Sequence, residues 1–532
     1  MWDTRRNDHR TIRHGAPSRT IPGPDAETGG QPSRRIPVLP GRPVTATTRR
    51  FFIENLGCPK NAVEGEGMAE RLRLAGYAAT DDAHDADVVI VNTCSFIQPA
   101  QEESIDRLFH YLNARRTGQK VVAAGCLAER FGDALDKDMP ELDGIIGTRQ
   151  WFEIDRLLAE VERGVRPCWH GADAVADPTF ARHAVGPTAY VKIAEGCNMA
   201  CTFCAIPSFK GAQRSKAVAD VVAEVRQLVD GGAREVILVA QNTTAYGLDM
   251  AREPGTTRGS SPLARLLEAI CAGVPDLPWL RVHYCYPGWV NDDLLETMAR
   301  LDQVVNYLDM PLQHADPEIL RAMNRPRDMR HVADVLARAR TLMPDLALRT
   351  TFIAGFPGET DAHWQSVLDF MDEVRFDHVG VFTYFPEVGT PAASLGGTVP
   401  DRTRKRRQRA AMARQQEISA SRTATLVGTT IDVLVEGVAE DDARASGIGG
   451  TGARLVGRTF RDAPEVDGFT VFEGTARRGQ IVPVAITRSG PYDLFGHQVG
   501  FVPAALGTDH PVNGAAPRKR IGLKSLPMAQ PR

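Results

Sequence analysis

Three cysteines in one short stretch have the spacing of a metal site. Cys197, Cys201 and Cys204 are spaced C-x3-C-x2-C within the run KIAEGCNMACTFCAIPSFKG at residues 192–211. Three thiolates this close together can bind three irons of a cubic 4Fe–4S cluster, which leaves the fourth iron without a protein ligand. An open iron can coordinate a small molecule, so the spacing indicates chemistry rather than a closed electron carrier. Phe203 adds an aromatic face beside the last cysteine.

Zinc and disulfides are the alternatives for these thiols. A structural zinc ion takes four protein ligands, and no fourth Cys or His lies nearby in the sequence. The nine cysteines are an odd number, and the first residues, MWDTRRNDHR, lack the apolar core of a secretory signal. Both points favour reduced, metal-binding thiols and predict a cytoplasmic protein.

The bulk composition narrows the class of partner. A net charge of −3 over 532 residues gives no strong overall field toward nucleic acid or acidic membranes. No uninterrupted apolar run approaches the roughly 20 residues that span a bilayer, so we expect no membrane partner. The 43% hydrophobic content supports packed cores, and the length allows about three domains.

A second group of three cysteines follows three predicted strands. RFFIENLGC is expected to form a strand that ends at Cys58, VVIVNTC one that ends at Cys94, and VVAAGC one that ends at Cys126. Helical patterns lie between them, so residues 49–165 are predicted to form a parallel α/β domain. The cysteines then lie at the carboxyl ends of parallel strands, where such sheets bind ligands. They predict a second three-thiolate site, against the alternative of three unrelated buried thiols.

After a linker predicted at residues 166–182, a second β/α rhythm fills residues 183–415. Six candidate strands alternate with amphipathic helical segments, which predicts a partial (β/α)6 barrel that is open on one side. The candidate strands are YVKIAEG, EVILVAQN, LRVHYCYP, VVNYLDMP, ALRTTFIAGFP and HVGVFTYFP. Loops after barrel strands carry the chemistry, and the three-cysteine loop follows the first of these strands.

Two further strand ends of this barrel carry candidate ligand contacts. Gln241 and Asn242 lie in VAQNTTAYG, and Gly355 and Gly358 lie in FIAGFPGE, where bare backbone lets a ligand approach closely. An ordinary turn is the alternative for the two glycines.

Five other residues of chemically capable types are assigned no role. Cys168, Cys271 and Cys285 are expected to be ordinary thiols. His283 and His314 lie near barrel strand ends, but a structural histidine is at least as common as a catalytic one.

The carboxy-terminal part begins with a basic stretch. Residues 401–422, DRTRKRRQRAAMARQQEISASR, have a helical pattern, and a solvated connecting helix is the default interpretation, with contact to ribosomal RNA or another polyanion as the alternative. About five short strands within residues 416–502 predict a small antiparallel barrel of the OB-like kind. Residues 1–48 and 503–532 have no packing pattern and are predicted to be disordered tails.

These pieces, in this order, resemble the methylthiotransferases, a family of radical S-adenosylmethionine (SAM) enzymes, over residues 50–502. The three-cysteine loop resembles the signature of the superfamily, and the family has an amino-terminal cluster domain, a radical SAM barrel and a small β-barrel called TRAM. LGCPKN at 56–61, NTCSFI at 92–97 and AAGCL at 123–127 look like the branch that modifies ribosomal protein S-12, as do YLDMPLQHA and SGPYDLFG. The transfer-RNA branch more typically reads GCQMN at the first site.

The departures from the family pattern are few. Asn242 stands where the family usually has Asp, Glu64 and Gly65 replace the common Asp-Ser, and Met199 replaces a frequent Arg. None of these positions is a cluster ligand in the family.

The resemblance implies methylthiolation of an unactivated carbon, here the β-carbon of an aspartate of ribosomal protein S-12. A 4Fe–4S cluster on Cys197, Cys201 and Cys204 would bind SAM at its open iron and donate one electron to it, which would cleave SAM to methionine and a 5′-deoxyadenosyl radical that abstracts hydrogen. A second 4Fe–4S cluster, on the other three cysteines, would hold the sulfur, which a further SAM methylates. The strand-end residues and Phe203 would contact SAM. The loop of the substrate would enter the open side of the barrel, with TRAM helping to hold it.

The implied partners are S-12 within the small ribosomal subunit, an electron donor and a sulfur donor. Two other functions remain open on the sequence. One is the same chemistry on adenosine in transfer RNA, favoured if TRAM and the basic helix bind RNA. The other is a non-enzymatic, metal-binding RNA adaptor, which would not cleave SAM.

Overall fold

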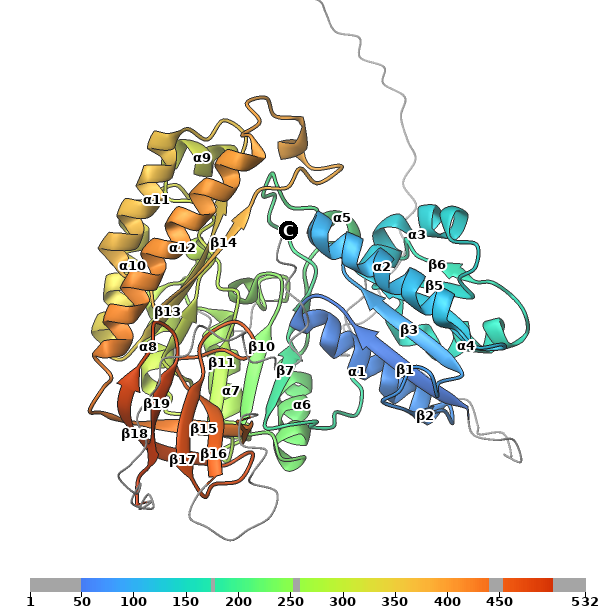
Figure 1. The fold of residues 1–532 in the computed structure, drawn as a ribbon, viewed down its shortest axis with the longest axis horizontal. Coiled ribbons are helices and arrows are strands. Elements are labelled where there is room, and N and C mark those ends of the chain that lie inside the picture. The colour runs from blue at the N-terminus through green and yellow to red at the C-terminus, as the bar shows by residue number, and fades with distance from the viewer. Residues whose placement is uncertain (1–48, 174–177, 252–258, 440–452, 501–532) are drawn as a thin grey trace, which may run out of the picture. The chain divides into compact units, whose positions relative to one another are not determined.

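The computed structural model describes residues 49–173, 178–251, 259–439 and 453–500. The two tails predicted at 1–48 and 503–532 lie outside the described residues. Figure 1 colours the described part from blue at the amino-terminal region to red at the carboxy-terminal strands. None of the helices in these ranges combines the length and the apolar character needed to cross a membrane.

The amino-terminal region is a six-stranded sheet in the order β2-β1-β3-β4-β5-β6, and all neighbours are parallel. Its strands are β1 Arg50–Asn55, β2 Ala78–Ala79, β3 Val88–Thr93, β4 Lys120–Gly125, β5 Gly144–Gly147 and β6 Cys168–Trp169. Its helices are α1 Pro59–Leu74, α2 Gln98–Ala114, α3 Cys126–Asp138 and α4 Ile154–Glu162, with the short 3-10 helix η1 Trp151–Glu153. The predicted parallel α/β domain is confirmed. β6 pairs with β5, so this sheet continues into the predicted linker.

Successive residues of the central strands enter two different cores, which explains why β3 is buried along its whole length. Val89 and Val91 of β3 pack with α2 and α3 on one face. Val88 and Ile90 pack with α1 and α4 on the other face. Helices therefore cover both faces, and only the edges of the sheet remain for a functional site.

The central region has six parallel strands in two three-stranded sheets, β7-β10-β11 and β12-β13-β14, in chain order. A parallel bridge between Leu280 and Val304 connects them. The strands are β7 Thr188–Lys192, β10 Glu235–Val239, β11 Trp279–Val282, β12 Tyr307–Asp309, β13 Ala347–Ala354 and β14 His378–Thr383, with the short β8 Ala194–Glu195 and β9 Arg214–Ser215. This is the predicted α/β region of six β/α units.

Helices alternate with these strands. They are α5 Ile206–Lys210, α6 Val218–Asp230, α7 Pro262–Gly273, α8 Asp292–Arg300, α9 Pro317–Ala322, α10 Met329–Leu342, α11 Asp361–Val374 and α12 Asp401–Ala424, with 3-10 turns η2 Thr243–Ala245, η3 Pro287–Trp289 and η4 Pro391–Ser394. Side-chain caps mark where some of these helices begin. The Asn291 side chain caps α8, and Thr360 and His363 form a capping box at α11. The long α12 packs against β14 and α11 (Figure 1).

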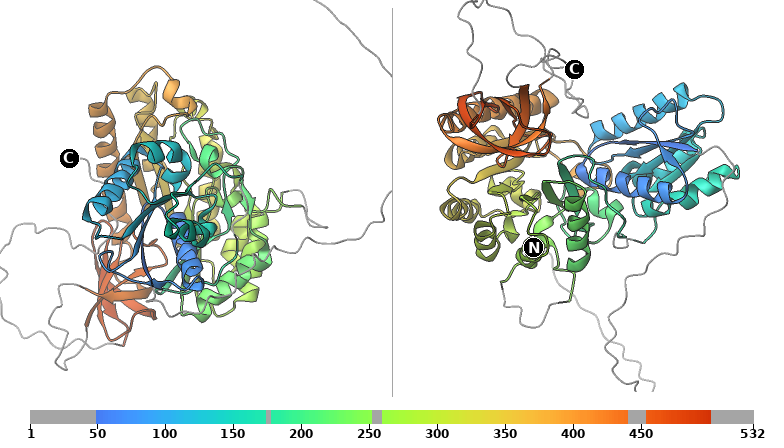
Figure 2. Two further views of the ribbon diagram at one scale, coloured as in Figure 1. Left: turned by 90° about the vertical axis from the view of Figure 1, so that its right-hand side faces the viewer. Right: turned by 90° about the horizontal axis from the view of Figure 1, so that it is seen from below.

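The carboxy-terminal strands close into a barrel in the order β15-β16-β17-β19-β18 (Figure 2). They are β15 Thr430–Val438, β16 Ala453–Thr459, β17 Thr470–Gly474, β18 Ile481–Ser489 and β19 Leu494–Gln498. The predicted small barrel is confirmed, with one difference in strand direction: β17 and β19 are parallel. A closed ring of five strands cannot alternate direction at every neighbour, so one parallel pair is unavoidable.

Candidate active site

The structure brings Cys58, Cys94 and Cys126 to one edge of the amino-terminal sheet. Cys58 precedes α1, Cys94 follows β3 and Cys126 is the first residue of α3. The preceding strands β1, β3 and β4 are direct neighbours. Because these strands are parallel, their carboxyl ends place the three thiols together, as the strand pattern predicted.

Asn61 ties this group together, and the sequence reasoning did not single it out. Its Oδ1 lies 3.4 Å from the Sγ of Cys126. Its Nδ2 donates to the carbonyls of Leu56 at 3.1 Å and Thr93 at 2.9 Å. One buried side chain therefore joins the loops of all three cysteines. Its place at the end of LGCPKN was the only signal available in the sequence.

Close backbone packing fixes the position of Cys94. A Cβ added to Gly57 would lie 2.6 Å from both Cβ and Sγ of Cys94, and Gly57 has φ +84°. The Ser104 hydroxyl accepts from the Cys94 N–H at 2.9 Å and donates to its carbonyl at 3.0 Å. Only glycine fits at position 57 without moving this cysteine.

Burial keeps the thiols of Cys94 and Cys126 protonated in the metal-free protein. It raises the pKa of Cys94 to about 12, and the neighbouring Cys58 adds to the effect. It raises the pKa of Cys126 well above its usual value, although Lys210 works in the opposite direction. A metal ligand must be a thiolate, so metal binding here has to release protons.

The loop that carries Cys197, Cys201 and Cys204 follows β7 and β8 and is anchored by its own backbone. The Cys197 N–H donates to the Gly211 carbonyl at 3.0 Å, and the Cys204 N–H donates to the Cys201 carbonyl at 3.1 Å. The Met199 N–H donates to the Cys197 Sγ at 3.4 Å. The loop thus folds around its three cysteines within the described structure.

Neighbouring elements also hold this loop. The Thr202 hydroxyl donates to the Ala322 carbonyl at 2.7 Å, and Arg325 Nη1 lies 3.9 Å from the Cys201 Sγ. Burial raises the pKa of Cys204 to about 12. Phe203 packs, partly buried, against the apolar cluster that contains Phe356.

The candidate SAM contacts at the end of β10 have unsatisfied polar atoms. Gln241 Nε2 donates to Glu195 Oε1 at 3.1 Å, and Asn242 Oδ1 accepts from the Thr244 hydroxyl at 2.9 Å. The Gln241 Oε1 and the Asn242 Nδ2 are buried and have no hydrogen-bond partner among the described residues. Buried polar atoms are normally paired, so these two fit a polar ligand at this strand end.

The two candidate glycines after β13 have different surroundings. A Cβ at Gly355, with φ +83°, would lie 2.1 Å from the Arg404 Cγ. Gly358 has φ +82°, open space around an added Cβ, and an N–H that donates to the Gly397 carbonyl at 2.8 Å. The Arg404 side chain packs against Gly355, whereas the space at Gly358 leaves its backbone approachable.

Four buried charges connect the two cysteine groups. Glu64 Oε1 of α1 lies 2.8 Å from Lys192 Nζ and 2.6 Å from Lys210 Nζ. Glu195 pairs with both lysines as well. Burial opposes the charge on Glu195, but the two ammonium groups outweigh it and lower its pKa to about 2. α1 starts beside Cys58, while Glu195 and Lys210 bracket the other cysteine loop.

A cation–π contact lies beside this network. Lys60 Nζ lies 4.0 Å from the ring centroid of Tyr284, whose backbone has φ +62°. Burial works against the charge on Lys60, but Cys58, Tyr284 and Glu195 raise its pKa above the usual value. A desolvated contact of this kind is worth about 2 kcal/mol.

The donor set fits two iron–sulfur clusters. All nine cysteines are free thiols, and two groups of three lie at strand ends without a fourth cysteine. Among the described residues, no three His, Cys, Asp or Glu side chains are placed to share one metal ion. A cubic cluster has no such requirement, because each thiolate binds its own iron. The unpaired atoms of Gln241 and Asn242 fit a small polar ligand nearby.

The residues that were assigned no role are buried or partly buried, and the Nε2 atoms of His283 and His314 have no hydrogen-bond partner among the described residues. Cys271 and Cys285 belong to the central hydrophobic core, and Cys168 lies in β6. His314 Nδ1 accepts from the Asp316 N–H at 2.9 Å. His283 is buried, and burial lowers its pKa to about 4, so it is neutral near pH 7.

Comparison with known proteins matches three families along the chain. Residues 50–147 match the Uncharacterized protein family UPF0004, residues 191–371 the Radical SAM superfamily, and residues 427–499 the TRAM domain. These three matches follow the three regions of the fold.

Full-length relatives are similar over nearly all of the described chain. A ribosomal protein uS12 methylthiotransferase RimO from Herpetosiphon aurantiacus is 44% identical over 485 residues, 85% of this chain and 100% of its own length. A protein of the same name from Synechocystis is 42% identical over 453 residues, 84% of this chain and 97% of its own. Among solved structures, the radical SAM methyltransferase TsrM from Kitasatospora setae is 14% identical with a TM-score of 0.48, covering 76% of this chain and 79% of its own.

Radical SAM enzymes use a 4Fe–4S cluster and SAM, and the amino-terminal domain of the methylthiotransferases suggests a second cluster. Three observations indicate the same family: the identity to full-length relatives, the order of the three matched families along the chain, and the two groups of three cysteines. The chain belongs to the RimO family of radical SAM methylthiotransferases.

Proposed function

We propose that the protein transfers a methylthio group to the β-carbon of an aspartate of ribosomal protein uS12, within the small ribosomal subunit. The observation that carries the proposal is the pairing of two three-cysteine groups through the buried charges of Glu64, Lys192, Lys210 and Glu195. Inserting sulfur at an unactivated carbon needs a radical source and a sulfur carrier close together, and this arrangement supplies one place for each.

Each cysteine group has a separate role. Cys197, Cys201 and Cys204 would hold the first 4Fe–4S cluster, and Cys58, Cys94 and Cys126 would hold the second. When bound, the clusters and SAM supply the radical that removes hydrogen, the sulfur and the methyl group, which side chains alone cannot supply. An electron donor and a sulfur donor are required as partners.

The residues of the chain bind and orient these groups. Gln241 and Asn242 would hydrogen-bond the polar end of SAM with the two atoms that have no partner among the described residues. Gly358 would let the ligand approach the backbone, and Phe203 would cover the apolar side of the cysteine loop. The Gln241 amide is held by Glu195, so the buried charges also orient this contact.

The proposal of uS12 as the substrate rests on the similarity to the relatives. Both relatives described above are named as uS12 methylthiotransferases and are matched over nearly their whole length. The same chemistry on adenosine in transfer RNA is the competing function. A uS12 substrate places the reaction in the cytoplasm, where ribosomes are assembled.

Product analysis separates the two substrates. The full chain, reconstituted anaerobically with iron and sulfide, is given SAM, a reductant and either small ribosomal subunits or unmodified transfer RNA. We expect a methylthio mass increase on one aspartate-containing uS12 peptide and none on digested transfer RNA. Modification of transfer RNA alone would reject uS12 as the substrate, and failure to cleave SAM would favour the RNA-adaptor alternative.

A further inference from the structure

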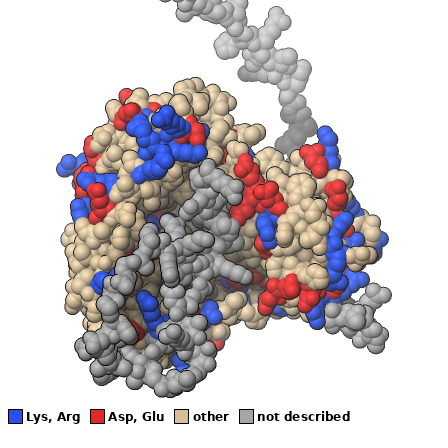
Figure 3. All heavy atoms as spheres, in the orientation of Figure 1, with Lys and Arg blue, Asp and Glu red and all other residues tan. Residues whose placement is uncertain are grey.

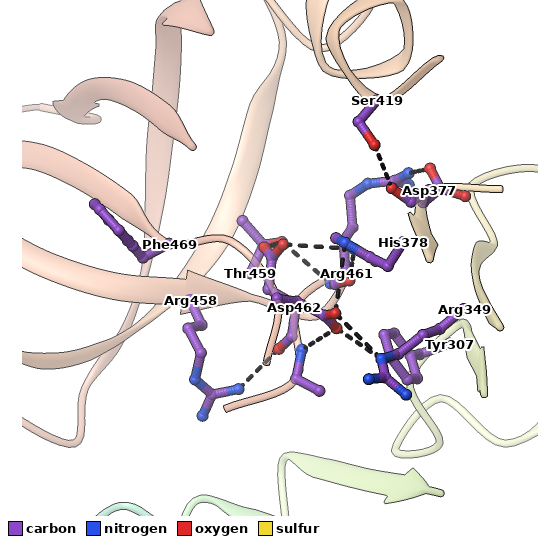
Figure 4. A network of polar contacts seen from close by, with 12 residues as sticks. Tyr307, Arg349, Asp377, His378, Ser419, Arg458, Thr459, Arg461, Asp462 and Phe469 are labelled. Atoms are coloured by element: carbon purple, nitrogen blue, oxygen red, sulfur yellow. Dashed lines mark hydrogen bonds and ion pairs between the residues drawn. The ribbon is translucent and has the colours of Figure 1, made fainter. Parts of the chain in front are cut away.

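The carboxy-terminal barrel is attached at the end of the central strands that lies farthest from the cysteine loop. Its Arg458 pairs with Glu235, the first residue of β10, at 2.6 Å, and its Asp467 accepts from the hydroxyl of Tyr307, the first residue of β12, at 2.6 Å. Figure 4 shows this junction from close by. The cysteine loop follows the opposite, carboxyl end of β7. Whatever this junction binds is therefore not the group that reacts at the cysteines.

A pocket of about 360 Å³ lies at the same junction. Ligand pockets typically have volumes of roughly 300–1,000 Å³. Its polar lining comes from the segments before β13 and β14, the end of α12 and the barrel: Asp345, Arg375, Ser421, Arg422, Thr425 and Arg461. Three guanidinium groups and the Ser421 hydroxyl are hydrogen-bond donors in this lining, the Thr425 hydroxyl already donates to the Arg422 carbonyl at 2.7 Å, and Asp345 is the single carboxylate of the lining.

Positive charge exceeds negative charge around this pocket. Arg422 and Arg461 both pair with one buried carboxylate, Asp377, as Figure 4 shows for Arg461. Arg340, behind the pocket, reaches that carboxylate only at 3.9 Å. Burial lowers the pKa of Arg340, and the like charges of Arg422, Arg461 and Arg375 lower it further. Together they outweigh the opposite effect of Asp377 and bring this pKa to about 10.

Asp345 does little to balance the excess. Its carboxylate accepts from the Asn306 amide at 2.6 Å, and its carbonyl accepts from Arg461. Four arginines, Arg340, Arg375, Arg422 and Arg461, thus meet three carboxyl groups, Asp345, Asp377 and Asp462, the last of which lies beside Arg461. An anion with several oxygens would complete the balance, and phosphate matches guanidinium geometry well.

Arg375 occupies a position where a helix usually ends on glycine. It is the residue after α11 and has φ +52°, a left-handed conformation that costs a non-glycine residue roughly 1 kcal/mol. Its guanidinium is exposed, donates to the Ser421 hydroxyl, and has no ion pair within the described residues. The Arg375 guanidinium can therefore bind an anion without giving up an ion pair among the described residues.

The basic residues in the amino-terminal part of α12, for which the sequence left contact with a polyanion open, are less available to bind one. Figure 3 shows Lys and Arg gathered over the amino-terminal part of α12. Several of these charges already have carboxylate partners: Lys405 with Asp401 at 2.8 Å, and Arg407 with Glu359 at 2.6 Å. At the other end of α12, beside the pocket, Arg422 shares the Asp377 carboxylate with Arg461, so two guanidinium groups there have one carboxylate between them.

We propose that the pocket formed by Arg375, Arg422, Arg461, Ser421 and Thr425 binds a phosphate group of an RNA backbone. The choice of phosphate comes from the pocket itself. The choice of RNA rests on the proposed function, because a small ribosomal subunit presents RNA phosphates around its proteins. The site would dock the enzyme on its particle from the side opposite to the reacting centre.

The test uses a fluorescein-labelled 12-nucleotide single-stranded RNA and the anaerobically reconstituted full chain, with affinity measured by anisotropy over a range of salt. Arg375→Gly removes the guanidinium and also relieves the backbone, so its melting temperature should stay equal or rise. We expect its RNA affinity to fall about tenfold, the loss of one charge-assisted contact. The slope of log affinity against log salt should lose about 0.7, the value for one phosphate on a single strand.

Arg409→Ala is the matched control, because Arg409 is exposed on α12 and lies outside the pocket. It should leave RNA affinity within about twofold, a difference too small for a lost phosphate contact. Equal losses in the two variants, or no RNA binding by the parent protein, would overturn the proposal.

Two competitors identify the source of the anion. Displacement of the RNA by a glutamate-rich 12-residue peptide would assign the pocket to an acidic protein, and submillimolar binding of inorganic phosphate without RNA binding would assign it to a free anion. None of these readouts needs turnover, so they stand apart from the test of substrate.

Discussion

The Glu64 carboxylate of α1 lies 2.6 Å from the Lys210 Nζ of α5, and both side chains are buried. Glu64 lies in the helix that begins beside Cys58, and Lys210 ends the short helix that follows Cys204. The Lys210 ammonium also donates to the Thr148 hydroxyl, which in turn donates to Glu64 Oε2 at 2.6 Å. The two cysteine groups are therefore joined by polar contacts that water does not screen.

Glu64→Gln should destabilise the protein strongly. Lys192 and Lys210 both lose the Glu64 charge while they still pair with Glu195, and removing one member of a buried ion pair costs about 3–5 kcal/mol. We expect a fall of several degrees in melting temperature and a larger loss of methylthio product than of SAM cleavage, because the two sites lose their fixed relation. Differential scanning fluorimetry and product mass spectrometry measure the two effects.

Glu160→Gln is the control for this change. Glu160 is paired with Arg163 at 3.9 Å on the surface, and such pairs contribute at most about 1 kcal/mol. Its melting temperature should therefore stay close to that of the parent. Equal melting temperatures for the two variants would show that the buried network does not hold the regions together.

Gly57→Ala should damage the group formed by Cys58, Cys94 and Cys126. The added Cβ would lie 2.6 Å from the Cys94 Sγ, in a backbone with φ +84° that already disfavours alanine. Gly118→Ala provides a close control, because Gly118 has the same φ of +84° but open space around an added Cβ. Both variants should lose about 1 kcal/mol from the backbone, and only Gly57→Ala should also lose bound iron. Iron analysis and melting temperature separate the two losses, and equal iron in both variants would contradict the packing argument.

The cysteine groups could be predicted because each depends on local pattern. Apolar runs that end in cysteine at intervals of one β/α unit place Cys58, Cys94 and Cys126 on neighbouring strand ends, and parallel pairing then brings them together. The three-cysteine loop needs even less, since its spacing lies within eight residues. Periodicity and topology were sufficient for both.

The contacts between regions could not be predicted in the same way. Lys210 and Glu64 are 146 residues apart in the chain, and neither belongs to a repeating pattern. Glu64 was noticed only as a departure from the family. Gly355 shows the converse problem, because its glycine signature fits both a ligand approach and the Arg404 side chain that lies against it. Strand direction in the small barrel also required knowing that the ring closes.

Acid should weaken the attachment of the carboxy-terminal barrel through Glu235. Burial tends to raise the pKa of Glu235, but Arg458 and Arg281 outweigh it and lower that pKa to about 2. A carboxyl whose pKa is lower in the folded than in the unfolded state stabilises fully above its unfolded value of about 4.3 and loses this contribution as the pH falls toward 2. Glu235→Gln should therefore lower the melting temperature at pH 7, and the difference from the parent should shrink between about pH 5 and pH 3. A difference that stays constant over this range would contradict the assignment.

Cys94→Ala tests the division of labour between the two cysteine groups. If each group holds its own cluster, the reconstituted variant should fall from about eight to about four irons per chain. It should still cleave SAM, because Cys197, Cys201 and Cys204 are untouched, but it should form no methylthio product. Cys271→Ala, a buried thiol of α7 outside both groups, is the control and should retain both irons and product. Product formed by Cys94→Ala at the parent rate would remove the amino-terminal cysteines from sulfur insertion, whereas loss of SAM cleavage together with product would mean that the two groups form one interdependent site.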